Sequence, residues 1–442
     1  MTSSRPVTTI GANWALLPDG WHQNVRIGVD AGGYVSSLGS TADGPVDQSA
    51  HVVIPGMVNI HSHAFQRKLV GRTQRFTKPG DDFWSWRTKM YADVAELTPS
   101  GQFECAASLY AEMLQNGYTT VAEFQYAHGA TSRRDLENPA LMSEALIQAS
   151  IATGMRTLLL PVLYQQAGFG NQPASKDQKP FVLDTDIFLG LVDHLTKATK
   201  AEPLISIGYA PHSLRAVAYD ALKAVLDHRV SNAPASPVHI HVSEQVREVT
   251  ECMLGTGMRP IEWLFSHFNV DSKWCLIHST HATQAELEAI IQAKATVGLC
   301  PTTEGDLGDG AFPCAEFLKK GGQFAIGTDS NVCVSPSEEL RFIDYQARIL
   351  SRKRNAFQFD GQYSAATRLY QKALEGGRMA TSLPVGRIEI GSCADFVELR
   401  EDHHLCQNKS ADEVLTTYVY SAGKDLVGKV FVSGILVMES RN

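Results

Sequence analysis

The stretch VIPGMVNIHSH, residues 53–63, places a short apolar run directly before two histidines that are separated by one residue. The apolar part, residues 53–60, is typical of a buried strand. In a strand, residues i and i+2 point to the same face, so His61 and His63 can reach one metal ion from the end of that strand. The H-x-H pattern alone is a weak signal, and the other strand ends are needed to support it.

Apolar runs of this kind recur along the chain, with helix-compatible stretches between them. The predicted strands are residues 53–60, 119–124, 156–163, 204–210, 238–242, 274–278, 296–300 and 324–328. The predicted helices are residues 101–116, 138–153, 186–199, 216–227, 261–268 and 284–293. Eight apolar strands alternating with helices predict an α/β protein with a (β/α)8 TIM-like barrel, because strands covered by helices are buried on both faces. A doubly wound open sheet is the alternative fold.

The two ends of the chain have a different pattern. Short strand-like segments separated by turn signals occur at residues 14–17, 25–29, 34–38, 391–399, 414–419 and 429–438. We therefore expect both chain ends to form one small β-sandwich domain, residues 1–52 with 386–442. The metal-dependent barrel domain, residues 53–385, is then inserted between them.

Residues of the types that bind metals end five of the eight predicted strands. They are His61 and His63, His212, His241, His278 and Asp329, in the order of the first, fourth, fifth, sixth and eighth strands. In a barrel these ends converge on one face, where active sites lie. Such a coincidence of independent positions predicts a metal site.

His61, His63, His241 and Asp329 together supply three imidazoles and one carboxylate. This set suits one Zn²⁺ per subunit, with one position left for water. A centre with two metals usually needs a bridging carboxylate or a modified lysine, and residues 204–210 contain no lysine. We therefore expect a single metal ion.

The sequence resembles the amidohydrolase superfamily in the 53–63 motif, in the pair His241-x-x-Glu244, in His278 and in Gly-Thr-Asp-Ser at 327–330. The resemblance spans nearly the whole chain. It implies that His61, His63, His241 and Asp329 bind the metal and that Glu244 carries protons. It also implies that His278, with Asp329, orients and deprotonates the attacking water, whose pKa zinc lowers to about 7.

Four shorter segments are similar to the formimidoylglutamate deiminases of that superfamily: residues 61–67, 122–126, 210–215 and 298–304. This narrower resemblance implies hydrolysis of N-formimidoyl-L-glutamate to N-formyl-L-glutamate and ammonia in histidine degradation. Asn331 departs from the pattern, because that family more often has histidine there.

The implied small-molecule substrate carries two carboxylates, which the bidentate forks of arginine recognise well. Arg215 follows His212 by three residues, and Arg87 lies in the insertion at 81–87. The resemblance places Gln66, Arg87, Tyr126 and Arg215 around the substrate and His212 near the reacting group. From chemistry alone, the arginines could equally be solvated, Gln66 and Tyr126 could be packing residues, and Glu244 could be a surface carboxylate at a helix start.

Two other functions stay open at this point. One is an aminohydrolase of the same superfamily acting on a purine, a pyrimidine or another amidine-like group, for which a pair of arginines is not needed. The other is a non-catalytic scaffold that has kept the barrel. The presence of all four ligands and of Glu244 argues against the scaffold.

The amino-acid composition limits the kinds of partner that the protein is expected to bind. The 442 residues are 44% hydrophobic and 19% charged, which is typical of a soluble globular protein. A net charge of −8 without a basic tract argues against nucleic acid. The absence of a secretory signal and of a long apolar run, together with eight cysteines without a C-x-x-C pair, predicts a cytoplasmic protein with no membrane partner. The family resemblance implies a homodimer.

Overall fold

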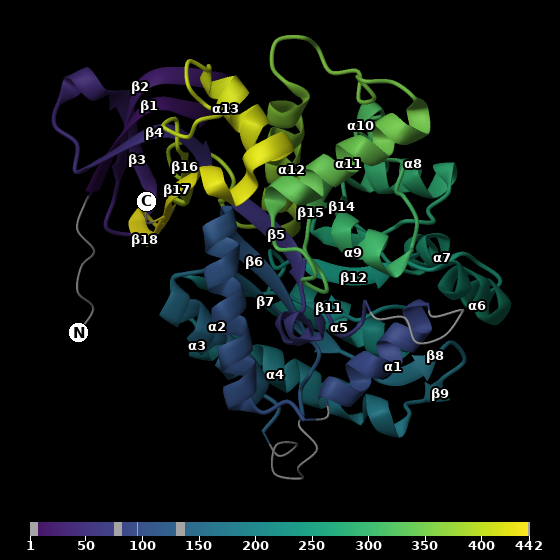
Figure 1. Ribbon diagram of the computed structural model, residues 1–442. Coiled ribbons are helices and arrows are strands. Elements are labelled where there is room, and N and C mark those ends of the chain that lie inside the picture. Colours follow the sequence, from purple (N-terminus) through teal and green to yellow (C-terminus); the bar gives the residue numbers. More distant parts are fainter. Residues whose placement is uncertain (1–7, 75–81, 95, 130–137, 441–442) are drawn as a thin grey trace.

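The computed structural model describes residues 8–74, 82–94, 96–129 and 138–440, and its centre is a barrel of parallel strands (Figure 1). The strands are β5 (Met57–Ser62), β6 (Tyr118–Gln125), β7 (Arg156–Leu163), β10 (Ile205–Ile207) with β11 (Ala210–Pro211), β12 (Val238–Val242), β13 (Trp274–His278), β14 (Thr296–Leu299) and β15 (Gln323–Ile326). Neighbours run in the order β10-β7-β6-β5-β15-β14-β13-β12, and β11 pairs with β7. Parallel bridges from Tyr209 to Val238 and from Ser213 to His241 close the ring. The predicted barrel is confirmed.

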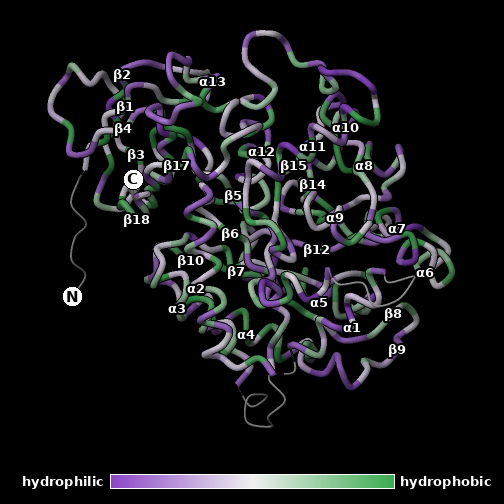
Figure 2. Tube along the Cα trace, in the orientation of Figure 1, coloured by the Kyte–Doolittle hydropathy of each residue, from purple (hydrophilic) through white to green (hydrophobic). Residues whose placement is uncertain are grey.

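Helices cover the outside of the barrel. They are α2 (Pro99–Asn116), α3 (Leu141–Thr153), α4 (Thr185–Ala198), α5 (Tyr219–Asn232), α6 (Val246–Thr256), α7 (Pro260–His267), α8 (Gln284–Ala293), α9 (Pro301–Leu307), α10 (Cys314–Lys319), α11 (Pro336–Ser351) and α12 (Ala365–Thr381). Hydrophilic and hydrophobic residues alternate along them in Figure 2, as expected of helices with one buried face. All six predicted helices are present within a few residues of the expected bounds. Over the described part of the chain, no helix is long and apolar enough to cross a bilayer.

A second sheet combines both chain ends beside the barrel (Figure 1). Its order is β18-β17-β16-β4-β1-β2-β3. The strands are β1 (Thr8–Leu17), β2 (Gly20–Val29), β3 (Val35–Ser40), β4 (Gln48–Pro55), β16 (Phe396–Leu399), β17 (Val427–Val432) and β18 (Ile435–Glu439). The pairing of the two chain ends is thus as expected. The exact division at residues 52 and 386 stays a prediction, and residues 1–7 of the expected domain lie outside the described residues.

The apolar run at 53–60 serves both sheets, and the expectation of one continuous strand there is wrong. Its first part belongs to β4, which pairs antiparallel with β16, and its second part to β5 of the barrel. Gly56 lies at the change of direction, where an added Cβ would overlap the side chain of Thr119. Both sheets bury these residues, so their apolar character does not show where β4 ends and β5 begins.

The strand expected at 414–419 is also wrong, because the structure has a helix there. It is α13 (Ala411–Thr417), followed by a π-helical turn at Tyr418–Ala422. Ser410 and Glu413 form a capping box at its N-terminus. Ala411, Val414, Leu415 and Tyr418 are buried, and their i, i+3, i+4, i+7 spacing makes one apolar helix face.

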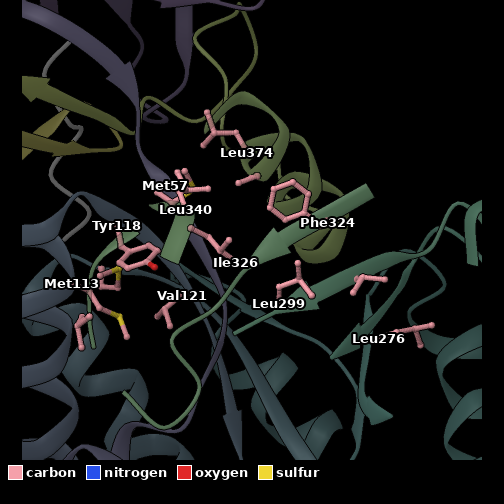
Figure 3. Packing of buried hydrophobic residues seen from close by; sticks show 14 of the residues in the cluster. Met57, Met113, Tyr118, Val121, Leu276, Leu299, Phe324, Ile326, Leu340 and Leu374 are labelled. Atoms are coloured by element: carbon pink, nitrogen blue, oxygen red, sulfur yellow. The ribbon is translucent and has the colours of Figure 1, made fainter. Parts of the chain in front are cut away.

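Close packing of α12 against the barrel holds β5 and β15 in place. Phe324 of β15 and Leu374 of α12 belong to the same buried cluster, and Figure 3 shows both side chains between these elements. Gly376 and Gly377 allow this approach, because an added Cβ would overlap the backbone of Phe324 at the first position and the side chain of Val58 at the second. The strand ends that follow β5 and β15 therefore rest on a rigid support.

A buried ion pair joins the barrel to the end sheet. Arg156, at the start of β7, donates to both carboxylate oxygens of Asp395 at 2.7 and 3.0 Å and to Ser433 Oγ at 2.8 Å. Asp395 also accepts the backbone N–H of Ser433 at 2.8 Å. The bidentate geometry and the added hydrogen bonds satisfy both charges away from water.

We predict that Asp395→Ala lowers the free energy of unfolding by about 3–5 kcal/mol, because it leaves the Arg156 guanidinium buried without its partner. Denaturant unfolding followed by fluorescence measures this change. Asp227→Ala is the control, since it removes an exposed i, i+4 pair with Lys223. Equal unfolding midpoints for the two variants would contradict the role given to the buried pair.

Candidate active site

The backbone turns sharply where three barrel strands end. Ser243 after β12, His278 at the end of β13 and Asp329 after β15 have φ values of 53°, 69° and 48°. This left-handed region is costly for residues other than glycine, and such strain concentrates at functional sites. Gly327 lets β15 lie close to β5 here, because an added Cβ would come within 2.8 Å of His61 Cβ.

The side chains of His61, His63, His241 and Asp329 converge in this space. Each contributes one ligand atom, and these atoms all lie within 4.8 Å of one another. Asp329 Oδ1 lies 3.2 Å from His63 Nε2 and 3.6 Å from His61 Nε2. His61 Nε2 lies 3.0 Å from His241 Nε2. All four predicted ligands are thus brought together.

Hydrogen bonds behind two of the rings determine which nitrogen faces the centre. Nδ1 of His63 donates to the carbonyl of Phe124 at 2.9 Å, and Nδ1 of His241 donates to the carbonyl of His212 at 3.0 Å. Carbonyl oxygens only accept, so Nε2 of each ring turns its lone pair toward the centre. Burial lowers the pKa of His61 and His241 well below the ordinary value, which favours neutral rings. Converging lone pairs with one carboxylate fit a divalent cation.

Asn331 ties the two strand ends together. Its amide Nδ2 donates to the carbonyls of His63 at 3.1 Å and Asp329 at 3.0 Å, and to Ser62 Oγ at 3.3 Å. Its Oδ1 accepts the hydroxyl of Thr328 at 2.6 Å. Asparagine at this position, where the family more often has histidine, therefore completes a hydrogen-bond network behind the predicted metal ligands.

Three carboxylates surround His278, two near Nε2 and one at Nδ1. Its Nε2 lies 3.8 Å from both Glu244 Oε1 and Asp329 Oδ2, and its Nδ1 donates to Glu304 Oε1 at 3.2 Å. Burial opposes a charge on the ring, but Glu244, Glu304 and Asp329 outweigh it and raise the pKa of His278 to about 10. Burial raises the pKa of Glu244, so its carboxylate takes up and holds a proton more readily than that of an exposed glutamate.

A pocket opens above this centre and contains the residues expected to bind substrate. Its lining includes Gln66, Arg87, Tyr126, His212 and Arg215, together with the predicted metal ligands His63, His241 and Asp329, and Glu244. Gln66 donates to the hydroxyl of Tyr126 at 2.7 Å. The ring of His212 lies 4.8 Å from that of His241. The expected residues therefore share one cavity with the metal ligands.

Two arginines of this pocket lack partners for some of their donors. Arg215 Nε and Nη1 and Arg87 Nη1 are buried without a hydrogen-bond acceptor among the described residues. Burial lowers the pKa of Arg87, and the nearby positive charge of Arg215 lowers it further. The ring of Trp84 on α1 (Phe83–Val94) lies 4.4 Å from the Arg87 guanidinium and 5.6 Å from that of Arg215. Two guanidinium groups that repel each other and keep unpaired N–H donors provide a site that suits an anionic ligand.

Sequence reasoning missed three buried glutamates that support the site. Glu304 bonds His278, Glu248 accepts the backbone N–H groups of Ser243 and Glu244, and Glu123 accepts that of Ala64, directly after His63. Glu304 lies in the 298–304 segment and could have been found as a carboxylate following a barrel strand. Glu248 and Glu123 carry no such signal, because only the fold turns them inward.

Comparison with known proteins agrees with this geometry. A family model described as amidohydrolase family matches residues 52–437, and the chain belongs to that family. A model described as the N-terminal domain of formimidoylglutamate deiminase HutF matches residues 7–47. The chain is 40% identical over 430 residues to a Pseudomonas aeruginosa protein named formimidoylglutamate deiminase, covering 97% of this chain and 94% of that one.

Two other relatives show how similar this chain is to other members of the family. The crystal structure of an amidohydrolase from Brucella melitensis matches with a TM-score of 0.89 and 39% identity, covering 97% of this chain and 94% of that one. A protein of Archaeoglobus fulgidus named 5-methylthioadenosine/S-adenosylhomocysteine deaminase 2 is 27% identical over 395 residues, covering 89% of this chain and 84% of that one. This chain is therefore more similar in sequence to the deiminase than to the nucleoside deaminase.

We predict that His63→Asn abolishes tight metal binding, because it removes one of four ligands. His194→Asn is the control, since His194 is exposed and pairs only with Glu144. Metal per chain is measured by mass spectrometry after dialysis. Retention of stoichiometric metal by the His63 variant would show that the cation binds elsewhere.

Proposed function

We propose that the chain hydrolyses N-formimidoyl-L-glutamate to N-formyl-L-glutamate and ammonia in histidine degradation. The observation that carries this proposal is the pair of arginines, Arg87 and Arg215, which line the same pocket as Glu244 and the predicted metal ligands and have buried N–H donors without an acceptor among the described residues. A substrate with two carboxylates matches two repelling cations, whereas a neutral purine or pyrimidine leaves them unpaired. The 40% identity to a protein named formimidoylglutamate deiminase supports the same substrate.

We propose one Zn²⁺ per subunit, held by His61, His63, His241 and Asp329. Three imidazoles and one carboxylate are a donor set that suits zinc and leaves a position for water. When bound, zinc supplies Lewis acidity and makes water a nucleophile at neutral pH. Residues 204–210, the strand region where a modified bridging lysine would be expected, contain no lysine, which supports a single ion.

The other steps of the reaction are assigned to side chains of the protein. Arg87 and Arg215 hold the carboxylates, and Gln66, Tyr126 and His212 line the path to the reacting carbon. His278 and Asp329 orient the attacking water from one side. Glu244 accepts the two protons of that water in turn, one on attack and one when the hydroxyl of the tetrahedral centre collapses to C=O, and passes both to the departing nitrogen, so that the =NH group leaves as ammonia and the N-formyl product remains. Its raised pKa suits both steps.

We further propose a homodimer in the cytoplasm. Phe342, Tyr345, Ile349 and Leu350 of α11 are exposed apolar side chains on one helix, which supports a protein contact there. Sedimentation analysis of the purified protein and cell fractionation test the two statements separately.

An ammonia-release assay tests the function. Zinc-loaded protein is expected to release ammonia from N-formimidoyl-L-glutamate in preference to N-formimidoyl-L-aspartate, adenosine or cytosine. Arg215→Met should raise KM for N-formimidoyl-L-glutamate about 30-fold or more, because a hydrogen-bonded charge partner is lost. Arg400→Met is the control, since that arginine pairs with Asp402 on the end sheet. Unchanged KM and turnover in the Arg215 variant would exclude this substrate.

Glu244→Gln is expected to lower kcat about 10²–10⁴-fold, because the amide cannot accept and return a proton. Metal content should be unchanged, since Glu244 is not among the metal ligands. Steady-state kinetics and metal analysis of the same preparation measure both effects. A variant that keeps its kcat would rule out Glu244 as the proton carrier.

A further inference from the structure

Two tyrosines line the same pocket as the arginines, and neither takes part in the chemistry proposed above. Tyr91 lies on α1, and Tyr164 follows directly after β7. Both line the pocket beside Arg87 and Arg215. The ring of Tyr164 also lies 4.8 Å from that of His212, so the tyrosines extend from the arginines toward the reacting group.

Gln178 holds both hydroxyl groups from behind. It lies on the 3-10 helix Lys176–Phe181, and its Oε1 accepts the backbone N–H of Ser175 at 2.9 Å. This bond determines the orientation of the amide, so its Nε2 faces the tyrosines. Nε2 lies 2.5 Å from the hydroxyl of Tyr164 and 3.4 Å from that of Tyr91.

Counting donors leaves one hydroxyl hydrogen without an acceptor among the residues that the structure describes. The amide nitrogen of Gln178 can only donate, so both tyrosine oxygens accept from it and must donate their own hydrogens elsewhere. Burial, aided by a hydrogen bond with Tyr164, raises the pKa of Tyr91, so its phenol keeps its hydrogen. An O–H of one tyrosine that donates to the other, the interaction that helps to raise the pKa of Tyr91, uses one of the two hydrogens. Arg87 and Arg215 cannot accept the other.

We propose that Tyr91 and Tyr164, positioned by Gln178, supply a neutral O–H donor to one carboxylate of the substrate and thereby help to select a dicarboxylate. This rests on the proposed function. A hydroxyl adds a hydrogen bond between two guanidinium groups without adding a third positive charge. A lysine in its place would increase the repulsion that already acts between Arg87 and Arg215.

Tyr164→Phe and Tyr91→Phe test the donor, since each removes a single oxygen atom. KM for N-formimidoyl-L-glutamate is expected to rise about tenfold or more in at least one variant, with kcat within about twofold, because a hydrogen bond to a charged group is lost in substrate binding. Tyr209→Phe is the matched control, since Tyr209 is buried outside the pocket and its hydroxyl contacts His228.

Gln178→Glu tests the orientation of the hydroxyl hydrogens. A carboxylate can still accept the Ser175 N–H but draws the tyrosine hydrogens toward itself, so KM should rise as in the Tyr→Phe variants. Gln178→Met, which removes the amide without adding a charge, should have a smaller effect. Equal KM values for wild type and Gln178→Glu would overturn the positioning role.

Substrate analogues separate this role from a loss of packing. N-formimidoyl-4-aminobutyrate and N-formimidoyl-L-2-aminobutyrate each lack one carboxylate. For the analogue that lacks the bonded carboxylate, whichever of Tyr164→Phe and Tyr91→Phe raises KM for N-formimidoyl-L-glutamate should change KM less than twofold. A proportional rise for all three compounds, or for none, would overturn the proposal.

Calorimetry with glutarate keeps the two proposals distinguishable. If zinc-loaded wild type releases no ammonia from N-formimidoyl-L-glutamate, the proposed function fails. The tyrosine donor is then judged by glutarate binding to the same zinc-loaded proteins. A weaker Kd for Tyr164→Phe or Tyr91→Phe than for wild type and Tyr209→Phe supports the donor, and equal Kd values overturn it.

Discussion

The contact between β5 and β15 is the constraint on which the active site depends. Backbone N–H groups of Thr328 and Asp329 bond the carbonyl of His61, and the N–H of His63 bonds the carbonyl of Asp329. These bonds bring a carboxylate to two imidazoles at the mouth of the barrel. Asn331 strengthens the same junction, and the two adjacent glycines of α12 let it rest on a packed helix. The contact that joins β5 to β15 in the barrel therefore also sets the positions of three predicted metal ligands, His61, His63 and Asp329.

Charge is distributed across the pocket in a way that matches the proposed substrate. One end gathers carboxylates around His278, and the other gathers the guanidinium groups of Arg87 and Arg215. An amidine end and a dicarboxylate end meet opposite charges in such a cavity. Because the pocket is largely buried, these interactions are screened less than on the surface, and mismatched ligands leave charged groups unpaired.

Much of this arrangement was predictable from the chain, because strand periodicity and barrel geometry act together. His61 and His63 share a strand face, and the ends of parallel strands meet at one rim, so the group of candidate ligands followed from spacing, while the family resemblance implied which four bind the metal. The assignment of residues 414–419 failed because a short apolar run can form a strand or a helix, and the signals for the helix, the Ser410 cap and the apolar spacing from Ala411, begin before the run. Tyr164 and Gln178 gave no signal, since their meeting depends on connections outside the barrel strands.

The central claim is that the barrel strand ends hold a single catalytic cation. Anomalous diffraction from crystals of the zinc-loaded protein, collected on both sides of the zinc absorption edge, tests it most directly. We predict one peak per chain, within bonding distance of His61, His63, His241 and Asp329. A peak at another place, or a second peak of equal height beside it, would contradict the account.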